Sequence, residues 1–191
     1  MNSISPTSAK IVRLLAATAT DSPTEADRQP SHLVPSEHEV IDGLAKELSA
    51  GDNADTAALA AALTSGVYER VRQRSMARRP ASALEAARTL EADQLSRSLL
   101  LTALLRNRGL AARLVLGLRA SPESPTEAAF HVWTEVWLDD HWHGFDPATG
   151  TTIDGGYLSM RVTSLTEPDV FAVILPVMEN IAKLRRVLAV D

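Results

Sequence analysis

The chain contains no cysteine among its 191 residues. This absence excludes disulfide bonds, thiolate metal ligands and a thiol nucleophile together. Aromatic residues make up only 4% of the chain, and no apolar run approaches the roughly 20 residues that a membrane-spanning helix needs. Hydrophobic residues account for 45% and charged residues for 23%, which is typical of a soluble globular protein with a single domain.

The chain also lacks a strong excess of charge of either sign. Its 19 basic and 24 acidic residues give a net charge of −5 without long blocks of one sign, so nucleic acid is not an expected partner. The apolar patch that follows Lys10 and Arg13 is too short for a secretory signal. We therefore expect a cytoplasmic protein that makes no contact with a membrane.

The sequence divides into a polar N-terminal region, residues 1–36, and a domain over residues 37–191. The first region is rich in Ser, Thr, Pro and Asp, which predicts an N-terminal strand near residues 10–16 followed by a flexible arm. Ser36, with Glu39 three residues later, is typical of a helix N-terminus. Apolar spacing predicts helices over residues 36–51, 55–74, 82–89, 93–108 and 167–189, the last with Pro176 as a point of kinking.

A change of periodicity to two marks the strands. Residues 110–119 are predicted to form a buried strand, and residues 130–138 alternate between an apolar face and a face that carries His131 and Trp133. Asp139-Asp140 is a turn signal that leads into a strand over residues 142–145. Helices followed by an antiparallel hairpin predict an α+β fold with N-terminal helices packed on an antiparallel sheet.

The hairpin is unusually rich in residues that support chemistry. Residues 130–146 hold five of the eight aromatic residues and three of the five histidines. His131 and Asp146 lie on opposite arms, where a carboxylate can orient an imidazole that acts as a base. The alternative interpretation is a structural histidine within a core of aromatic side chains.

Two groups of motifs resemble the transglutaminase-like cysteine enzymes, which have a papain-like fold. The central helix of that family is similar to Ala92-Asp93-Gln94 followed by Ala103-Leu104-Leu105-Arg106 and Gly109-Leu110-Ala111-Ala112-Arg113. The strings His131-Val132-Trp133-Thr134-Glu135-Val136 and Trp142-His143-Gly144-Phe145-Asp146-Pro147 resemble its His and Asp motifs. Arg97-Ser98-Leu99 and the Arg-rich stretch up to Arg113 resemble the bacterial branch that contains lasso-peptide leader peptidases.

The resemblance aligns the family's nucleophilic cysteine with Gln94. A glutamine amide cannot attack an acyl carbon, so the thioester route is closed. The resemblance then implies His131 as the base, Asp146 as its orienter and Gln94 as a hydrogen-bonding polariser or anchor at a helix N-terminus. The residues assigned to substrate binding are Asp93, Trp133 and Trp142.

Three functions remain open from the sequence. The first is an enzyme without the thiol that performs cyclisation, elimination, isomerisation or acyl hydrolysis in bacterial specialised metabolism. Its substrate would be a small-molecule or peptide-like group, presented alone or on a carrier or leader peptide. The second is an inactive binding protein, and the third is a serine-dependent hydrolase that uses Ser96 or Ser98. We expect no cofactor and no metal, because His141 and His143 lack a third ligand at suitable spacing.

Overall fold

A single buried helix, α5 (Gln94–Asn107), lies at the centre of the molecule. The computed structural model describes residues 21–49, 55–74, 80–121, 128–153 and 155–188. Residues 95–106 of α5 are buried on every side, as expected of a helix enclosed by its neighbours. The other helical elements are η1 (Glu25–Asp27), α2 (Glu39–Leu48), α3 (Thr56–Arg70), α4 (Ala83–Thr89) and α6 (Val170–Leu188).

The main sheet has five antiparallel strands in the order β6-β5-β4-β3-β7. Its members are β3 (Ala112–Ala120), β4 (Ala128–Leu138), β5 (His141–Asp146), β6 (Thr151–Thr152) and β7 (Tyr157–Thr163). A short parallel pair joins β1 (Arg72–Gln73) to β2 (Glu91–Ala92). The α+β architecture and the β4–β5 hairpin are confirmed, whereas the sequence pattern missed β6 and β7.

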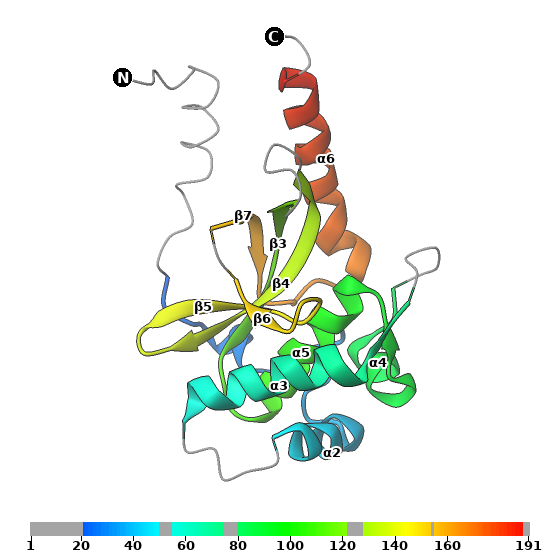
Figure 1. The fold of residues 1–191 in the computed structure, drawn as a ribbon, viewed down its shortest axis with the longest axis vertical. Coiled ribbons are helices and arrows are strands. Elements are labelled where there is room, and N and C mark those ends of the chain that lie inside the picture. Colours follow the sequence, from blue (N-terminus) through cyan, green and yellow to red (C-terminus); the bar gives the residue numbers. More distant parts are fainter. Residues whose placement is uncertain (1–20, 50–54, 75–79, 122–127, 154, 189–191) are drawn as a thin grey trace.

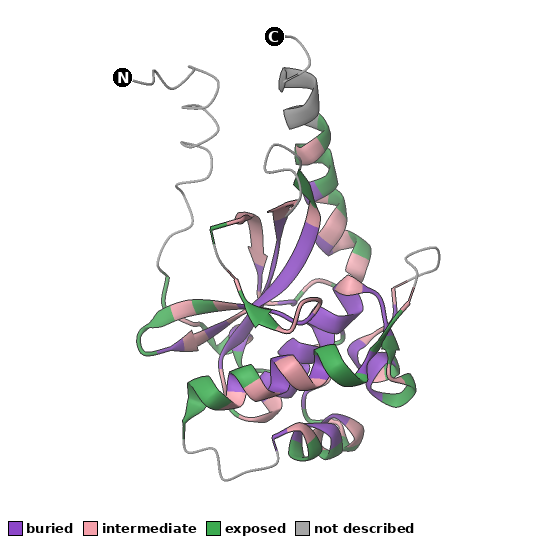
Figure 2. Cartoon of the chain, in the orientation of Figure 1, coloured by how far each residue is buried: buried purple, intermediate pink, exposed green. Residues whose placement is uncertain are grey.

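Alternation along β4 assigns one face of the sheet to α5. Ser98 Oγ lies 3.2 Å from the carbonyl oxygen of Val132, and the hydroxyls of Thr102 and Thr134 are 3.3 Å apart. Both contacts join α5 to the even-numbered face of β4. The odd-numbered residues, which include His131, therefore lie on the opposite face, as the periodicity predicts. Figure 2 shows the buried residues concentrated in α5 and β4.

Arg106 ties the peripheral loops to α5. Its guanidinium is almost fully buried and donates hydrogen bonds to the carbonyl oxygens of Gln29, Ala112 and Ser164. Burial lowers the pKa of Arg106 to about 10, which still leaves it charged at neutral pH. A buried cation with several carbonyl acceptors holds three separate segments in place, because losing any acceptor would leave a desolvated N–H group without a partner.

The predicted flexible arm is wrong for residues 21–36, while residues 1–20, including the predicted strand, lie outside the described part of the chain. Val34 is fully buried in the core, and Asp27 accepts hydrogen bonds from both the backbone and the hydroxyl of Thr24 at 2.8 Å. Burial of the Val34 side chain stabilises this segment against the core, although the segment is polar in composition. The N-cap of α2 is also His38 rather than Ser36, since His38 Nδ1 accepts from the backbone N–H of Val40.

Helix α6 lies at one end of the sheet and contacts β3 and β7. Val173 and Val177 anchor it to the core, and Pro176 lies inside it as the sequence predicts. Its C-terminal half extends beyond the strands (Figure 1). Among the described residues, no helix combines the length and apolar character required to cross a membrane.

Candidate active site

The N-terminus of α5 forms one side of the site. Asp93 is the N-cap, and its Oδ1 accepts hydrogen bonds from the backbone N–H and the hydroxyl of Ser96, each at 2.9 Å. Asp93 is only 3% exposed. The predicted substrate-binding role of Asp93 is therefore replaced by helix capping, because its carboxylate is committed to the helix that it begins.

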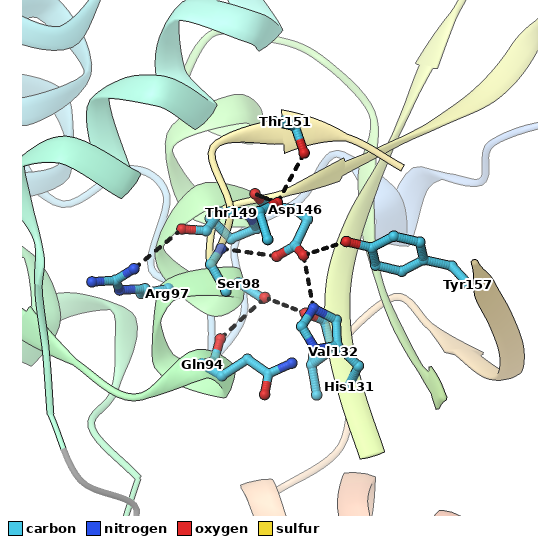
Figure 3. A network of polar contacts seen from close by, with 11 residues as sticks. Gln94, Arg97, Ser98, His131, Val132, Asp146, Thr149, Thr151 and Tyr157 are labelled. Atoms are coloured by element: carbon cyan, nitrogen blue, oxygen red, sulfur yellow. Dashed lines mark hydrogen bonds and ion pairs between the residues drawn. The ribbon is translucent and has the colours of Figure 1, made fainter. Parts of the chain in front are cut away.

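Gln94, the first residue of α5, presents its amide to His131. The side chain is partly buried, and Figure 3 shows its amide nitrogen directed toward the imidazole. That nitrogen is buried and has no hydrogen-bond partner. An unpaired buried donor costs about 1–3 kcal/mol, so an acceptor placed beside it would be stabilised.

A tight turn sets the register of the sheet side of the site. Asp139 and Asp140 adopt positive φ angles of 48° and 62°, the combination found in a two-residue type I′ hairpin turn. The turn pairs Trp137 with Trp142. Continuing this register places Asp146 beside the segment of β4 that carries His131, on the same face of the sheet.

His131 and Asp146 form a short hydrogen bond. His131 Nε2 lies 2.7 Å from Asp146 Oδ2, and Asp146 is fully buried (Figure 3). An ionised carboxylate only accepts hydrogen bonds, so it selects the imidazole tautomer with the proton on Nε2. The lone pair then lies on Nδ1, which is the nitrogen left to take a proton from a substrate.

Two further donors hold the Asp146 carboxylate. Tyr157 Oη donates to Oδ2 at 2.7 Å, and the backbone N–H of Ala148 donates to Oδ1 at 2.8 Å. Burial pushes the pKa of Asp146 upward, but the hydrogen bonds from His131, Tyr157 and Ala148 outweigh it and leave the pKa below its usual value. Burial and the bond to Asp146 raise the pKa of Tyr157 to about 12, which keeps its hydroxyl a donor.

Tyr157 is the site residue that sequence reasoning missed. It lies at the start of β7, which pairs with β3 and not with the hairpin that carries His131 and Asp146. No spacing along the chain indicates that β7 joins the sheet beyond β3. The only local signal is the Gly155-Gly156 pair before a tyrosine, which is typical of a turn into a strand.

Trp133 packs against Tyr157, the residue that donates a hydrogen bond to Asp146. It is 1% exposed, and its ring stacks edge-on against Tyr157 with centroids 5.5 Å apart. Its ring also packs over Gly117, where an added Cβ would come within 2.9 Å of it. The ring of Trp133 is enclosed by protein, so its predicted role as a wall that contacts substrate stays a prediction.

Trp142 lies away from the His131–Asp146 pair, so the structure does not bring this predicted substrate-binding residue together with them. It is four residues before Asp146 on an extended strand, a separation of roughly 13 Å. Its indole N–H donates to the carbonyl oxygen of Asp21, and the Arg113 guanidinium lies 3.8 Å from its ring centroid. Arg113 also pairs with Asp21 and Glu135, so Trp142 belongs to a structural cluster that holds residue 21 against the sheet.

The two serines considered as nucleophiles are engaged in structural hydrogen bonds. Ser96 binds the Asp93 carboxylate, and Ser98 Oγ lies between the carbonyl oxygens of Gln94 and Val132 at 3.2 Å from each. Both residues are fully buried. Their hydroxyls face the cap and the underside of β4, so the geometry gives no support to a serine nucleophile activated by His131.

Arg97 connects α5 to the loop that follows Asp146. Its guanidinium is buried and hydrogen bonds to the carbonyl oxygens of Val71 and Pro147. Burial lowers the pKa of Arg97, while the negative charge of Asp146 opposes the shift. The bond to the Pro147 carbonyl therefore ties α5 to the backbone that directly follows Asp146.

The described residues contain no group of three or more histidine, aspartate or glutamate side chains arranged to hold a metal ion. His141 and His143 are both exposed on β5.

Comparison with known proteins assigns the family. The family model described as the transglutaminase-like superfamily matches residues 42–147, and the chain belongs to this family. This range contains α5 and the β4–β5 hairpin, and hence Gln94, His131 and Asp146. Tyr157 and α6 lie outside it. No curated protein matches the chain.

A solved structure shows the same fold. A candidate cysteine protease from Cytophaga hutchinsonii aligns with a TM-score of 0.62 and 21% identity over 72% of this chain and 46% of that one. The periplasmic domain of TgpA from Pseudomonas aeruginosa aligns with a TM-score of 0.48 and 22% identity over 65% of this chain and 46% of that one. The chain thus spans less than half the length of either structure.

Proposed function

We propose that this chain is a transglutaminase-like enzyme that works without a nucleophilic cysteine and uses His131 and Asp146 for general acid–base chemistry. The observation that carries the proposal is the 2.7 Å hydrogen bond between His131 Nε2 and Asp146 Oδ2. The Asp146 carboxylate is fully buried and also accepts hydrogen bonds from Tyr157 and Ala148. Such a pair can move protons without forming a covalent intermediate. Cyclisation, elimination, isomerisation and water-mediated acyl hydrolysis need only this base and a group that polarises the substrate.

Gln94 supplies the polarising group. Its unpaired amide nitrogen points toward the imidazole, so a substrate carbonyl held by that N–H would lie close to Nδ1 of His131. The N-terminal N–H groups of α5 and the positive end of its dipole favour the same negative charge. An acyl or peptide-like substrate has the required carbonyl.

The wider context follows from the sequence and the resemblance. We place the reaction in the bacterial cytoplasm, in specialised metabolism, with a substrate presented alone or on a carrier or leader peptide. The basis is the motif similarity to the branch that contains lasso-peptide leader peptidases.

The second candidate is a binding protein that retains the site without turnover. The missing thiol favours it, because Gln94 can hold a partner's carbonyl without reacting. The two candidates differ in whether His131 takes a proton during a reaction.

Hydrolysis of p-nitrophenyl acetate, an activated acyl ester, separates them. The enzyme proposal predicts that His131→Ala lowers the rate by about 10²-fold, the usual contribution of a general base. His143→Ala is the matched control, because it removes an exposed histidine from the neighbouring strand. Equal rates for wild type, His131→Ala and His143→Ala would contradict the enzyme proposal and favour the binding protein.

A further inference from the structure

Arg119 differs from the other two arginines on the strands of the main sheet. Arg113 and Arg161 each form an ion pair with an acidic side chain. Arg119 is half-buried, and its guanidinium has neither an ion pair nor a hydrogen bond within the part of the chain that the structure describes. A guanidinium that is partly removed from water without a counter-charge favours binding of an anion, above all a carboxylate that matches its planar fork of donors.

Arg119 lies on the same face of the sheet as His131. Its partners in the two neighbouring strands are Ala129 on β4 and Tyr157 on β7, and residues directly opposite each other share a face. His131 follows Ala129 by two residues, so the alternation of the strand places it on this face as well. Ala129 is exposed and has only a methyl group, so the position opposite Arg119 on β4 leaves room for a ligand.

The ring of Tyr157 connects Arg119 to the site. The guanidinium carbon of Arg119 lies 5.4 Å from the ring centroid of Tyr157, and the ring centroid of His131 lies 5.5 Å from the same point. An adipoyl group, allowing for a hydrogen bond at each end, is long enough to span the separation that these two distances permit. The charge of Arg119 also opposes the rise in the pKa of Tyr157, so the cation acts electrostatically on the site.

The acidic group of the site is already paired. Asp146 is fully buried, and its Oδ2 accepts hydrogen bonds from His131 and Tyr157. The net charge of −5 disfavours anions at the surface of the protein in general, so selective binding of an anion requires a local cation. Arg119 supplies a cation on the site face whose charge is not committed to an acidic side chain of the described residues.

We propose that Arg119 binds a carboxylate at the far end of the acyl group, so that the substrate is a monoester or monoamide of a dicarboxylic acid. This inference rests on the proposed function for one point, the position of the reacting carbonyl beside Gln94 and His131. The carboxylate and the guanidinium form charge-assisted hydrogen bonds, which a neutral acyl chain cannot make. Arg119 thereby determines the specificity of the site for an anionic chain and takes no part in proton transfer.

Calorimetric titration with two unreactive amides tests the carboxylate site. Adipamate, the monoamide of adipic acid, carries a carboxylate at pH 7, whereas hexanamide has the same chain length and no charge. We expect the wild type to bind adipamate at least about tenfold more tightly than hexanamide, and Arg119→Gln to bind both equally. Arg119→Lys retains the charge and should retain a preference for adipamate. Arg88→Gln is the matched control, because it removes the charge of an exposed arginine on α4.

Three results would overturn the carboxylate site. The first is a wild type that binds neither amide or binds both equally, and the second is a preference for adipamate that Arg119→Gln leaves intact. The third is an equal loss of affinity for both amides in Arg119→Gln, which would assign Arg119 a structural role through Tyr157. Because the titration needs no turnover, a chain that prefers adipamate but hydrolyses p-nitrophenyl acetate independently of His131 would overturn only the enzyme proposal.

Discussion

The helix side and the sheet side of the site differ in how their polar atoms are satisfied. On the sheet side, the Asp146 carboxylate receives hydrogen bonds from His131, Tyr157 and Ala148. On the helix side, the amide nitrogen of Gln94 is buried without a partner. The comparison shows that the Asp146 carboxylate has its hydrogen-bond donors in the folded protein, while the Gln94 amide nitrogen has no acceptor.

The largest expected effect comes from removing the charge on the sheet side. Asp146→Asn removes the charge and turns one of the two accepting oxygens into an NH2 donor, so the bonds from His131 and Tyr157 and the bond from Ala148 cannot all be kept. Bonds to a charged group are worth about 1.5–3 kcal/mol. We expect the free energy of unfolding to fall by about 2–3 kcal/mol. Urea denaturation at pH 7 measures it, and a loss below about 0.5 kcal/mol would show that the network does not stabilise the fold.

The next test is the pH dependence of the difference in the free energy of unfolding between wild type and Asp146→Asn. The pKa of Asp146 is lowered in the folded state, so its stabilisation is present above the ordinary aspartate value near 3.8 and is lost as the pH falls through the lower folded pKa. The stability difference between wild type and Asp146→Asn should therefore shrink as the pH falls below about 3.8. A difference that stays unchanged or grows below that pH would contradict the lowered pKa.

Restoring a thiol on the helix side tests whether the two sides still fit each other. In Gln94→Cys the thiol lies at a helix N-terminus beside His131, an environment that lowers a cysteine pKa. Thr56→Cys is a matched control, because Thr56 is also the first residue of a helix capped by an aspartate, Asp55, but without a histidine partner.

We expect the Gln94→Cys thiol to have a pKa at least about one unit below that of Thr56→Cys, which is a tenfold gain in thiolate at pH 6. Iodoacetamide labelling rates against pH measure both values in a chain with no other thiol. The difference should vanish in the double variant with His131→Ala. Equal pKa values in the two single variants would show that the sides no longer face each other.

A smaller effect is expected at Tyr157. Tyr157→Phe removes one hydrogen bond to Asp146 but keeps the ring that packs on Trp133, so the free energy of unfolding should fall by about 1 kcal/mol. The rate with p-nitrophenyl acetate should fall less than in His131→Ala, since the His131–Asp146 bond remains. A loss of activity equal to that of His131→Ala would assign Tyr157 a direct catalytic role.

The smallest effect, and one of opposite sign, is expected at Gln94. Gln94→Leu replaces a buried unpaired donor with an apolar group of similar size, so stability should stay within about 1 kcal/mol of wild type or rise. Thermal unfolding measures this change. A marked loss of stability would show that the amide has a structural partner and that both sides of the site are internally satisfied.

Much of the fold follows from local signals in the sequence. The apolar spacing of α3 to α6, the alternation in β4 and the Asp139-Asp140 turn all predict their elements within a few residues. The turn also predicts that His131 and Asp146 meet, because a two-residue hairpin fixes the pairing of its two strands. The N-terminal arm was misjudged because its composition is polar while its burial depends on only a few residues, Val34 among them.

The contacts between distant segments could not be predicted. The sequence predicts that Trp142 lines the substrate site, because it is an aromatic residue in the hairpin. In the structure it instead contacts Arg113 and the carbonyl oxygen of Asp21. Tyr157 gives no signal, because its part in the site depends on β7 adding to the edge of the sheet beside β3. Both outcomes depend on strand order, which periodicity within a strand does not encode.

The amino-acid sequence by itself determined that the chain offers no thiol nucleophile, where most of the helices and the β4–β5 hairpin form, and that one histidine and one aspartate share that hairpin. Only the tertiary structure decided that His131, Tyr157 and Ala148 lower the pKa of that aspartate. It also decided that Trp133 is enclosed, that Asp93 caps α5 and that the Gln94 amide nitrogen has no partner. The physical reason is that backbone preferences and turns act between near neighbours in the chain, whereas burial, pKa shifts and unpaired donors arise from packing between segments far apart in the sequence.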